Sequence, residues 1–198
     1  MDNASHTTPS SSDVNGFINA FLRNPFEEGA LKSQLKYGLL ANKWMKSGFS
    51  EIIENLDLYE SYIRSYESFM LALHIFRAQK RELRSQKLEL IADDPIDRLF
   101  PQKKSRRYKG NFELSDFRNL GKAVNRVTSY LKKTIIGETE VIRTIKKNAW
   151  SASFGLDAMV ALYNREMIRN NNVLIRGESG TGKELFAQAL LRSDVGGS

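Results

Sequence analysis

The chain has 198 residues with a formal net charge of +7, and 41% of its residues are hydrophobic and 27% charged. This length predicts one or two domains, and the balance allows a buried core and argues against wholesale disorder. The absence of cysteine excludes disulfides and thiolate metal sites, and two distant histidines, His6 and His74, do not suggest a metal cluster. No apolar run reaches the roughly 20 residues that span a bilayer, and no signal peptide is recognisable, so we expect a cytoplasmic protein without a membrane segment.

The positive charge is concentrated in the second half of the chain. Residues 99–198 carry 18 Lys and Arg against 9 Asp and Glu, whereas residues 1–98 carry 12 against 14. A basic half favours polyanionic partners such as nucleic acid or nucleotide phosphates. The same excess is also typical of an ordinary solvated surface, so both interpretations stay open.

The first expected elements are a disordered tail and two short helices. Residues 1–15 are rich in Ser, Thr, Asn and Asp without an apolar period, which predicts disorder. From residue 16 to 48 apolar positions recur at helical spacing, with Pro25 and Gly48 marking helix ends. These apolar positions are Phe17, Phe21, Leu31, Leu35, Leu39, Leu40 and Trp44.

One long amphipathic helix is predicted within residues 50–91, where the chain contains neither Gly nor Pro, and it completes a helical region over 16–92. Its apolar side chains recur three and four positions apart and form one stripe. The stripe is either a coiled-coil seam for homo-oligomerisation or one face of an antiparallel bundle. Lys80 falls where a heptad requires an apolar residue, which favours the bundle. We expect His74, beside the stripe, to pack or to lie at the surface.

Residues 93–111 break the helical pattern and predict a linker or long loop, because they hold two prolines, a glycine and a basic cluster over 103–109. Such a cluster either contacts a phosphate backbone or is a solvated connector. Helical spacing then returns over residues 112–150, with a turn at Gly137. A further amphipathic helix follows Gly155 and ends before three asparagines at 170–172.

A strand, a glycine-rich loop and a helix are predicted in succession after these asparagines. Val173–Ile175 is a short apolar run suited to a buried strand, and helical spacing resumes after Lys183. This order is the context that a phosphate-binding P-loop requires. Its glycines would let main-chain amides point at an anion, and Lys183 would contact the β- and γ-phosphates. Glu184 departs from the general motif, which has Ser or Thr there as a magnesium ligand.

The run VLIRGESGTGKELFAQAL resembles the Walker A segment of the bacterial sigma-54-dependent transcription activators, AAA+ ATPases also called enhancer-binding proteins. Members of that family typically read GESGTGKE at this point, with the second Glu included. The resemblance implies ATP as cofactor, with Mg²⁺ in full-length relatives, and implies sigma-54 RNA polymerase, a self-assembled ring and enhancer DNA as partners. It assigns the ATP phosphates to Gly177, Glu178, Ser179, Gly180, Thr181, Gly182, Lys183 and Glu184.

The expected fold is therefore mostly α, with a helical N-terminal region followed by the first strand, P-loop and helix of a truncated α/β AAA+ domain over residues 151–198. Only fifteen residues follow Lys183, so the family's Walker B pair, sigma-54-contacting loop and arginine fingers are missing from this sequence. We expect an N-terminal portion of a sigma-54-dependent regulator that hydrolyses no ATP by itself, because phosphoryl transfer needs several separate elements. Two alternatives stay open: a stand-alone helical interaction or oligomerisation module with a vestigial P-loop, and a basic nucleic-acid-binding protein.

Overall fold

The computed structural model describes residues 9–47, 62–86, 110, 112–164 and 173–193. The described part is mostly helical, as predicted, and contains no strand. The helices are α1 (Ser11–Leu22), α2 (Ala30–Ser47), α4 (Tyr62–Gln86), α6 (Leu114–Thr134), α7 (Glu140–Phe154), α8 (Ala158–Tyr163) and α10 (Lys183–Leu191).

Side chains placed just before the helices fix several of their starts. The Ser10 hydroxyl accepts a hydrogen bond from the Asp13 amide at 3.2 Å, and Thr139 does the same for Ile142 at 3.4 Å. Asp157 accepts from two amides at the start of α8, at 2.8 and 3.2 Å. These contacts satisfy amides that a helix leaves without partners at its first turn.

The predicted disordered tail over residues 1–15 extends too far, because α1 begins at Ser11. The serine run that suggested disorder contains the cap: Ser10 is the N-cap of α1, and Val14 on the first turns is buried. Residues 1–8 lie outside the described part of the chain. Composition alone did not separate a tail from a capped first turn, since Ser and Asp are favoured in both.

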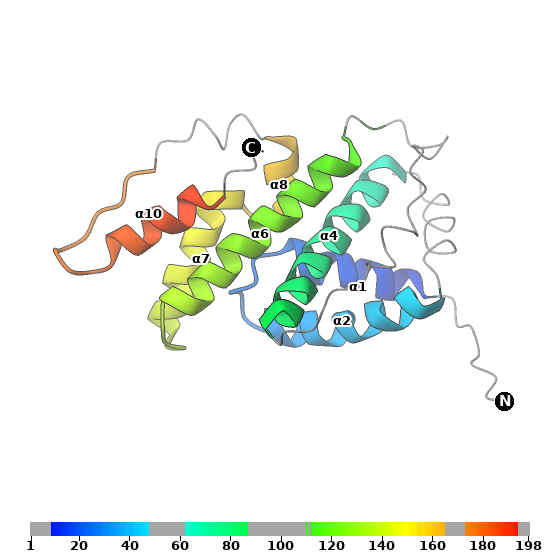
Figure 1. Cartoon of the computed structure of the whole chain (residues 1–198), viewed down its shortest axis with the longest axis horizontal. Coiled ribbons are helices and arrows are strands. Elements are labelled where there is room, and N and C mark those ends of the chain that lie inside the picture. The colour runs from blue at the N-terminus through cyan, green and yellow to red at the C-terminus, as the bar shows by residue number, and fades with distance from the viewer. Residues whose placement is uncertain (1–8, 48–61, 87–109, 111, 165–172, 194–198) are drawn as a thin grey trace.

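Helix α4 lies at the centre of the bundle, between α1 on one side and α6 on the other (Figure 1). Every residue from Phe69 to Arg77 is buried, so the middle of this helix is covered on all its faces and not along one stripe. The bundle interpretation of the long helix is therefore the one the structure supports. His74 is among these buried residues, 4% exposed, and packs against α6.

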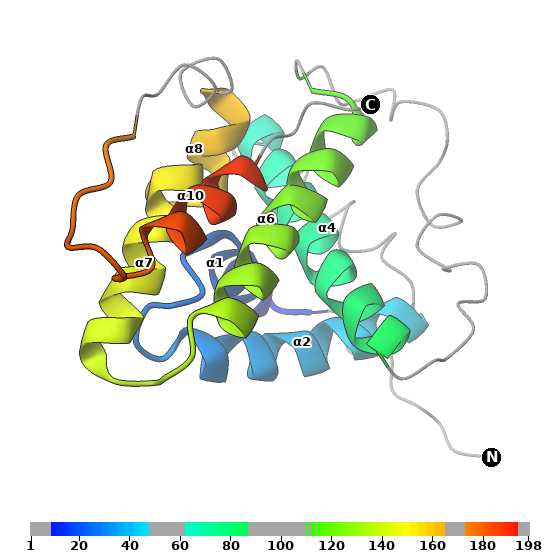
Figure 2. The ribbon, with the colours of Figure 1, turned by 60° about the vertical axis from the view of Figure 1, so that its left-hand side comes forward.

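Aromatic rings form the core where α1, α2 and α4 meet. The Phe17 ring lies 4.9 Å from that of Phe21 and 5.8 Å from that of Trp44, centroid to centroid, and Phe76 contacts both phenylalanines. Burying each such side chain contributes roughly 1.5–3 kcal/mol to folding. On the other side of α6, Trp150 and Phe154 of α7 are fully buried. Figure 2 shows α7, α8 and α10 grouped along that side.

The strand predicted over Val173–Ile175 is not formed. These residues have no regular secondary structure, and the Val173 and Leu174 side chains are 45% and 73% exposed. A strand needs a hydrogen-bonded neighbour, and within the described residues the only bridge outside helices joins Arg23 to Asp157. The linker predicted over 93–111 lies outside the described residues, apart from Gly110. No helix in the described ranges is long and apolar enough to cross a membrane.

Candidate functional site

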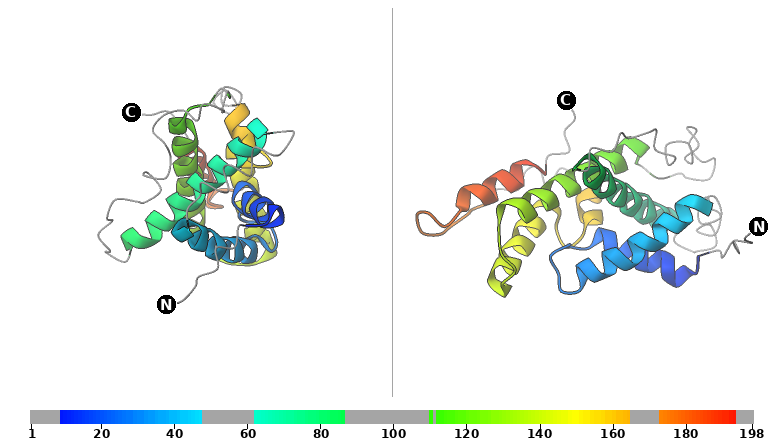
Figure 3. Two further views of the ribbon diagram at one scale, coloured as in Figure 1. Left: turned by 90° about the vertical axis from the view of Figure 1, so that its right-hand side faces the viewer. Right: turned by 60° about the horizontal axis from the view of Figure 1, so that its bottom comes forward.

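The predicted phosphate loop occupies one exposed turn that leads directly into α10. Residues 177–182 form the turn and residues 183–184 begin the helix, so all eight predicted site residues lie together. The turn projects from the bundle beyond the start of α10 (Figure 1, and Figure 3, right). Its side chains are accessible to a ligand from solvent, since every residue from Gly177 to Thr181 is exposed.

Glycine is required at three points of this turn. Gly180 and Gly182 both have a φ of +79°, a left-handed conformation that strains any residue with a Cβ. At Gly177 the obstacle is spatial, because an added Cβ would lie 2.9 Å from the Thr181 hydroxyl oxygen. The sequence therefore specifies the path of the backbone here, as a phosphate cradle requires.

The Lys183 side chain folds back over the turn. Its Nζ donates to the carbonyl oxygen of Gly177 at 2.8 Å and to the carbonyl oxygen of Glu178. An ammonium group carries three N–H donors, so two contacts to the loop leave one donor for an anion. Thr181 tightens the same turn, because its hydroxyl donates to the Glu178 carbonyl oxygen at 2.7 Å.

Helix α10 starts without a side-chain cap. Its N-cap is Gly182, and no side chain in the described part of the protein accepts from the first amides of the helix. This start differs from those of α1, α7 and α8, which have Ser, Thr and Asp caps. Uncapped amides together with the positive end of the helix dipole favour a negative ligand at this end.

Glu184 lies in the first turn of α10, and its carboxylate is held away from the loop. Its Oε1 accepts a hydrogen bond from Gln188 Nε2 at 3.3 Å, one turn further along the helix. The second acidic residue, Glu178, contributes its backbone carbonyl oxygen to the turn, as described above. In these contacts, neither the Glu178 nor the Glu184 carboxylate bonds to the backbone of the loop.

Contacts with α6 hold α10 in position. The Tyr130 hydroxyl donates to Gln188 Oε1 at 2.8 Å, and the Arg192 guanidinium lies 4.3 Å from the centre of the Tyr130 ring. Ala189 of α10 is fully buried. The helical spacing over residues 112–150 gave no indication of this role for Tyr130. The sequence signal for such a contact is weak, since a tyrosine at a helical core position usually indicates packing.

Comparison with known families agrees with the position of the loop. Residues 151–195 match the model of the sigma-54 interaction domain, a segment that includes the end of α7, α8, the loop and α10. No curated protein and no solved structure matches the chain.

Proposed function

We propose that the chain is part of a sigma-54-dependent regulator and that residues 177–184 bind the phosphates of ATP. The match of residues 151–195 to the sigma-54 interaction domain supports this proposal. The interaction domain is an ATP-binding family in general. We assign the phosphate contacts to the backbone of the turn, to the first amides of α10 and to Lys183. The helical region that precedes this segment takes the regulatory role, and the protein acts in the cytoplasm.

The position of Lys183 is the observation that carries this proposal. Its ammonium lies over the turn, bonded to the Gly177 carbonyl oxygen, at the end of α10 where the amides have no side-chain cap. A bound phosphate would meet a positive charge and several N–H donors within one turn of chain. Charge-assisted hydrogen bonds of this kind contribute about 1.5–3 kcal/mol each.

The described residues do not fit the usual magnesium arrangement of such a loop. The general motif supplies a hydroxyl ligand after the lysine, and this chain has Glu184, whose carboxylate is engaged by Gln188. The nearby Thr181 hydroxyl donates to a backbone carbonyl instead. The proposed function of this loop is therefore phosphate binding without an assigned magnesium ligand.

Calorimetric titration of the 198-residue chain with ATP, ADP and adenosine tests the assignment. We expect ATP to bind more tightly than ADP and adenosine to bind without detectable heat, because the assigned contacts all go to phosphates. Lys183→Ala should weaken ATP binding at least tenfold, since one charge-assisted hydrogen bond is lost. Lys32→Ala is the matched control: it removes one exposed lysine from α2 and should leave ATP binding unchanged.

Two results would count against phosphate binding at this loop. Equal affinity of the wild type and Lys183→Ala for ATP would show that the nucleotide binds elsewhere. Absence of ATP binding to a chain that unfolds cooperatively would show that the turn does not hold phosphate. Thermal unfolding of each variant without nucleotide separates these results from misfolding.

A further inference from the structure

Helix α2 carries an apolar stripe that the core does not cover. Leu31, Leu35 and Leu39 are spaced four residues apart, lie on one face of the helix and are 61%, 62% and 67% exposed. In the sequence these leucines recur at helical spacing, which indicates one apolar face and does not tell whether the core covers it. Single exposed leucines are common, whereas a contiguous exposed apolar row marks a surface that binds something.

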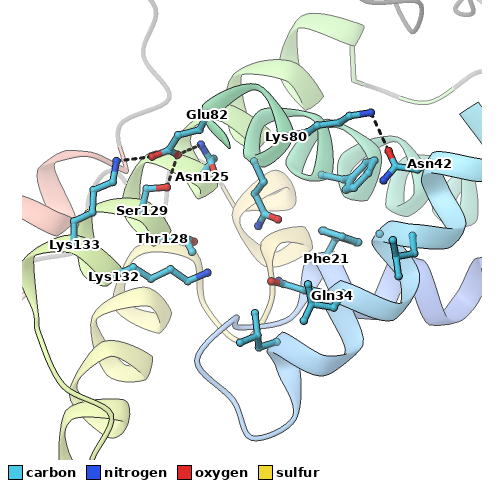
Figure 4. Close-up of a pocket in the computed structure, with 16 residues that line it drawn as sticks. Phe21, Gln34, Asn42, Lys80, Glu82, Asn125, Thr128, Ser129, Lys132 and Lys133 are labelled. Atoms are coloured by element: carbon cyan, nitrogen blue, oxygen red, sulfur yellow. Dashed lines mark hydrogen bonds and ion pairs between the residues drawn. The ribbon is translucent and has the colours of Figure 1, made fainter. Parts of the chain in front are cut away.

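The stripe forms one wall of a cavity of about 470 Å³ between α2, α4 and α6. Phe21 and Phe76 contribute aromatic surface to the same cavity. Gly38, which has no side chain, also lines it, between Leu35 and Leu39 of α2. This volume lies within the range of small-molecule sites, roughly 300–1,000 Å³. The cavity is a mainly apolar hollow with polar groups along its α6 side, as Figure 4 shows.

Thr128 is the first of these polar groups. Its residue is only 2% exposed, and its hydroxyl oxygen is buried without a hydrogen-bond partner among the described residues. Leaving a buried hydroxyl unsatisfied costs about 1–3 kcal/mol. Thr128 lines the cavity, so a molecule bound there can supply the missing partner once the hydroxyl turns toward it.

Lys132 lies one helical turn after Thr128 and extends toward the cavity, across from Gln34 of α2 (Figure 4). Its side chain as a whole is exposed to solvent, but desolvation of the ammonium lowers its pKa, and the charge of Lys146 acts in the same direction. The carboxylates of Glu82 and Glu138 partly oppose this shift. A negative group brought beside Lys132 would favour the charged form of this ammonium.

The other lysines that line the cavity are already engaged. Lys133 donates to Glu82 at 2.7 Å, and Lys80 donates to Asn42 at 2.9 Å. Glu82 is occupied as well, because it also accepts from Asn125 and Ser129. Among the described lining residues, Lys132 is the cation with no hydrogen bond or ion pair.

We propose that this cavity binds a small carboxylic acid with an apolar body. The body lies against the α2 leucines and the two phenylalanines, and the carboxylate accepts hydrogen bonds from the Thr128 hydroxyl and the Lys132 ammonium. A small molecule fits better than the surface of a partner protein, because the volume of the cavity lies in the range of small-molecule sites. This site is separate from the phosphate loop and does not depend on it.

Octanoate and 1-octanol are suitable probes, since they share an apolar chain and differ in the charged head. Binding to the 198-residue chain is measured by ligand-observed saturation-transfer NMR and by calorimetry. We expect octanoate to bind at least tenfold more tightly than 1-octanol. Lys132→Gln should remove most of that preference while 1-octanol binding stays unchanged, and Thr128→Val should weaken octanoate alone. Lys147→Gln is the control, because it removes the same charge from α7, where Lys147 pairs with Glu27 outside the cavity lining. It should leave octanoate binding unchanged.

Unfolding measurements without ligand separate a binding role from a structural one. Thr128→Val removes an unsatisfied buried hydroxyl, so the free variant should be as stable as the wild type or more stable. Failure of octanoate to bind the stably folded wild type, or equal binding to the wild type and Lys132→Gln, would overturn the proposal. A third result would also overturn it: light scattering shows a dimer, Leu35→Glu dissociates that dimer, and octanoate does not bind. The leucine stripe would then be a self-association surface.

Discussion

Gly121 of α6 sets how closely α6 approaches α4, and its replacement by alanine is a sharp test of the packing described above. A Cβ built on Gly121 would lie 2.8 Å from the backbone carbonyl carbon of His74 and 3.0 Å from its carbonyl oxygen. Real Cβ atoms essentially never approach other heavy atoms this closely. Because the obstacle includes helix backbone, relief requires α4 and α6 to move apart.

Two effects of opposite sign decide the outcome of Gly121→Ala. Alanine stabilises a helix interior by about 1 kcal/mol relative to glycine. Overpacking a closely packed contact costs about 1–3 kcal/mol, and a backbone obstacle belongs at the upper end of that range. We expect the free energy of unfolding to fall by about 1–2 kcal/mol.

Gly38→Ala is the matched control, since it makes the same change in the interior of another helix. Its Cβ would lie 3.4 Å from Phe76 Cε2, which is ordinary contact, so the helix-propensity gain should dominate and stability should rise by up to about 1 kcal/mol. Urea unfolding followed by circular dichroism measures both variants, with the slope m checked for constancy. If Gly121→Ala is as stable as Gly38→Ala, α4 and α6 do not cross at the described distance.

Two further predictions concern polar contacts that α6 makes with α4 and with α10. Burial raises the pKa of Glu82, but hydrogen bonds from Lys133, Ser129 and Asn125 and the charge of Lys133 outweigh burial, so the pKa is lowered overall. The ionised Glu82 carboxylate therefore contributes its full stabilisation above the unfolded pKa of about 4.3. This contribution is lost as the pH falls through the lower pKa of the folded state. Between about pH 5 and pH 3, the free energy of unfolding of Glu82→Gln, measured by urea titration, should therefore fall less than that of the wild type. The same fall in both proteins would contradict this prediction. Tyr130→Phe removes the 2.8 Å hydrogen bond to Gln188 and should cost about 1 kcal/mol of local stability, seen as roughly fivefold faster amide exchange in α10; unchanged exchange would mean that the bond does not hold this helix.

The helices of this protein were largely predictable, because their signals are local. Pro25 separates the first two helices, Gly137 precedes α7, and Gly155 ends α7 with a φ of +81°. The eight predicted loop residues are consecutive in the chain, and the structure places them in one turn and the start of α10. Whether that stretch holds phosphate stays a prediction.

The features that the sequence did not predict depend on distant parts of the chain. Apolar spacing on α2 and α4 looked alike, yet α4 is buried on all sides while Leu31, Leu35 and Leu39 stay exposed. Periodicity identifies an apolar face but does not tell which helix occupies the centre of a bundle. Val173–Ile175 failed as a strand for the same reason, because strand formation depends on a neighbouring strand and not on the run itself. The cavity had no sequence signal at all, since three separate helices form it.

The two proposed sites lie on opposite sides of α6. Thr128 and Lys132 are four residues apart and face the cavity, whereas Tyr130, midway between them, contacts α10. Positions two apart on a helix differ by about 200° in direction, so one straight helix presents both sets at once. The position of α6 is in turn fixed against α4 at Gly121, where no side chain separates the two backbones. The shape of the cavity and the position of α10, which follows the predicted phosphate loop, therefore both depend on the contact between Gly121 and α4.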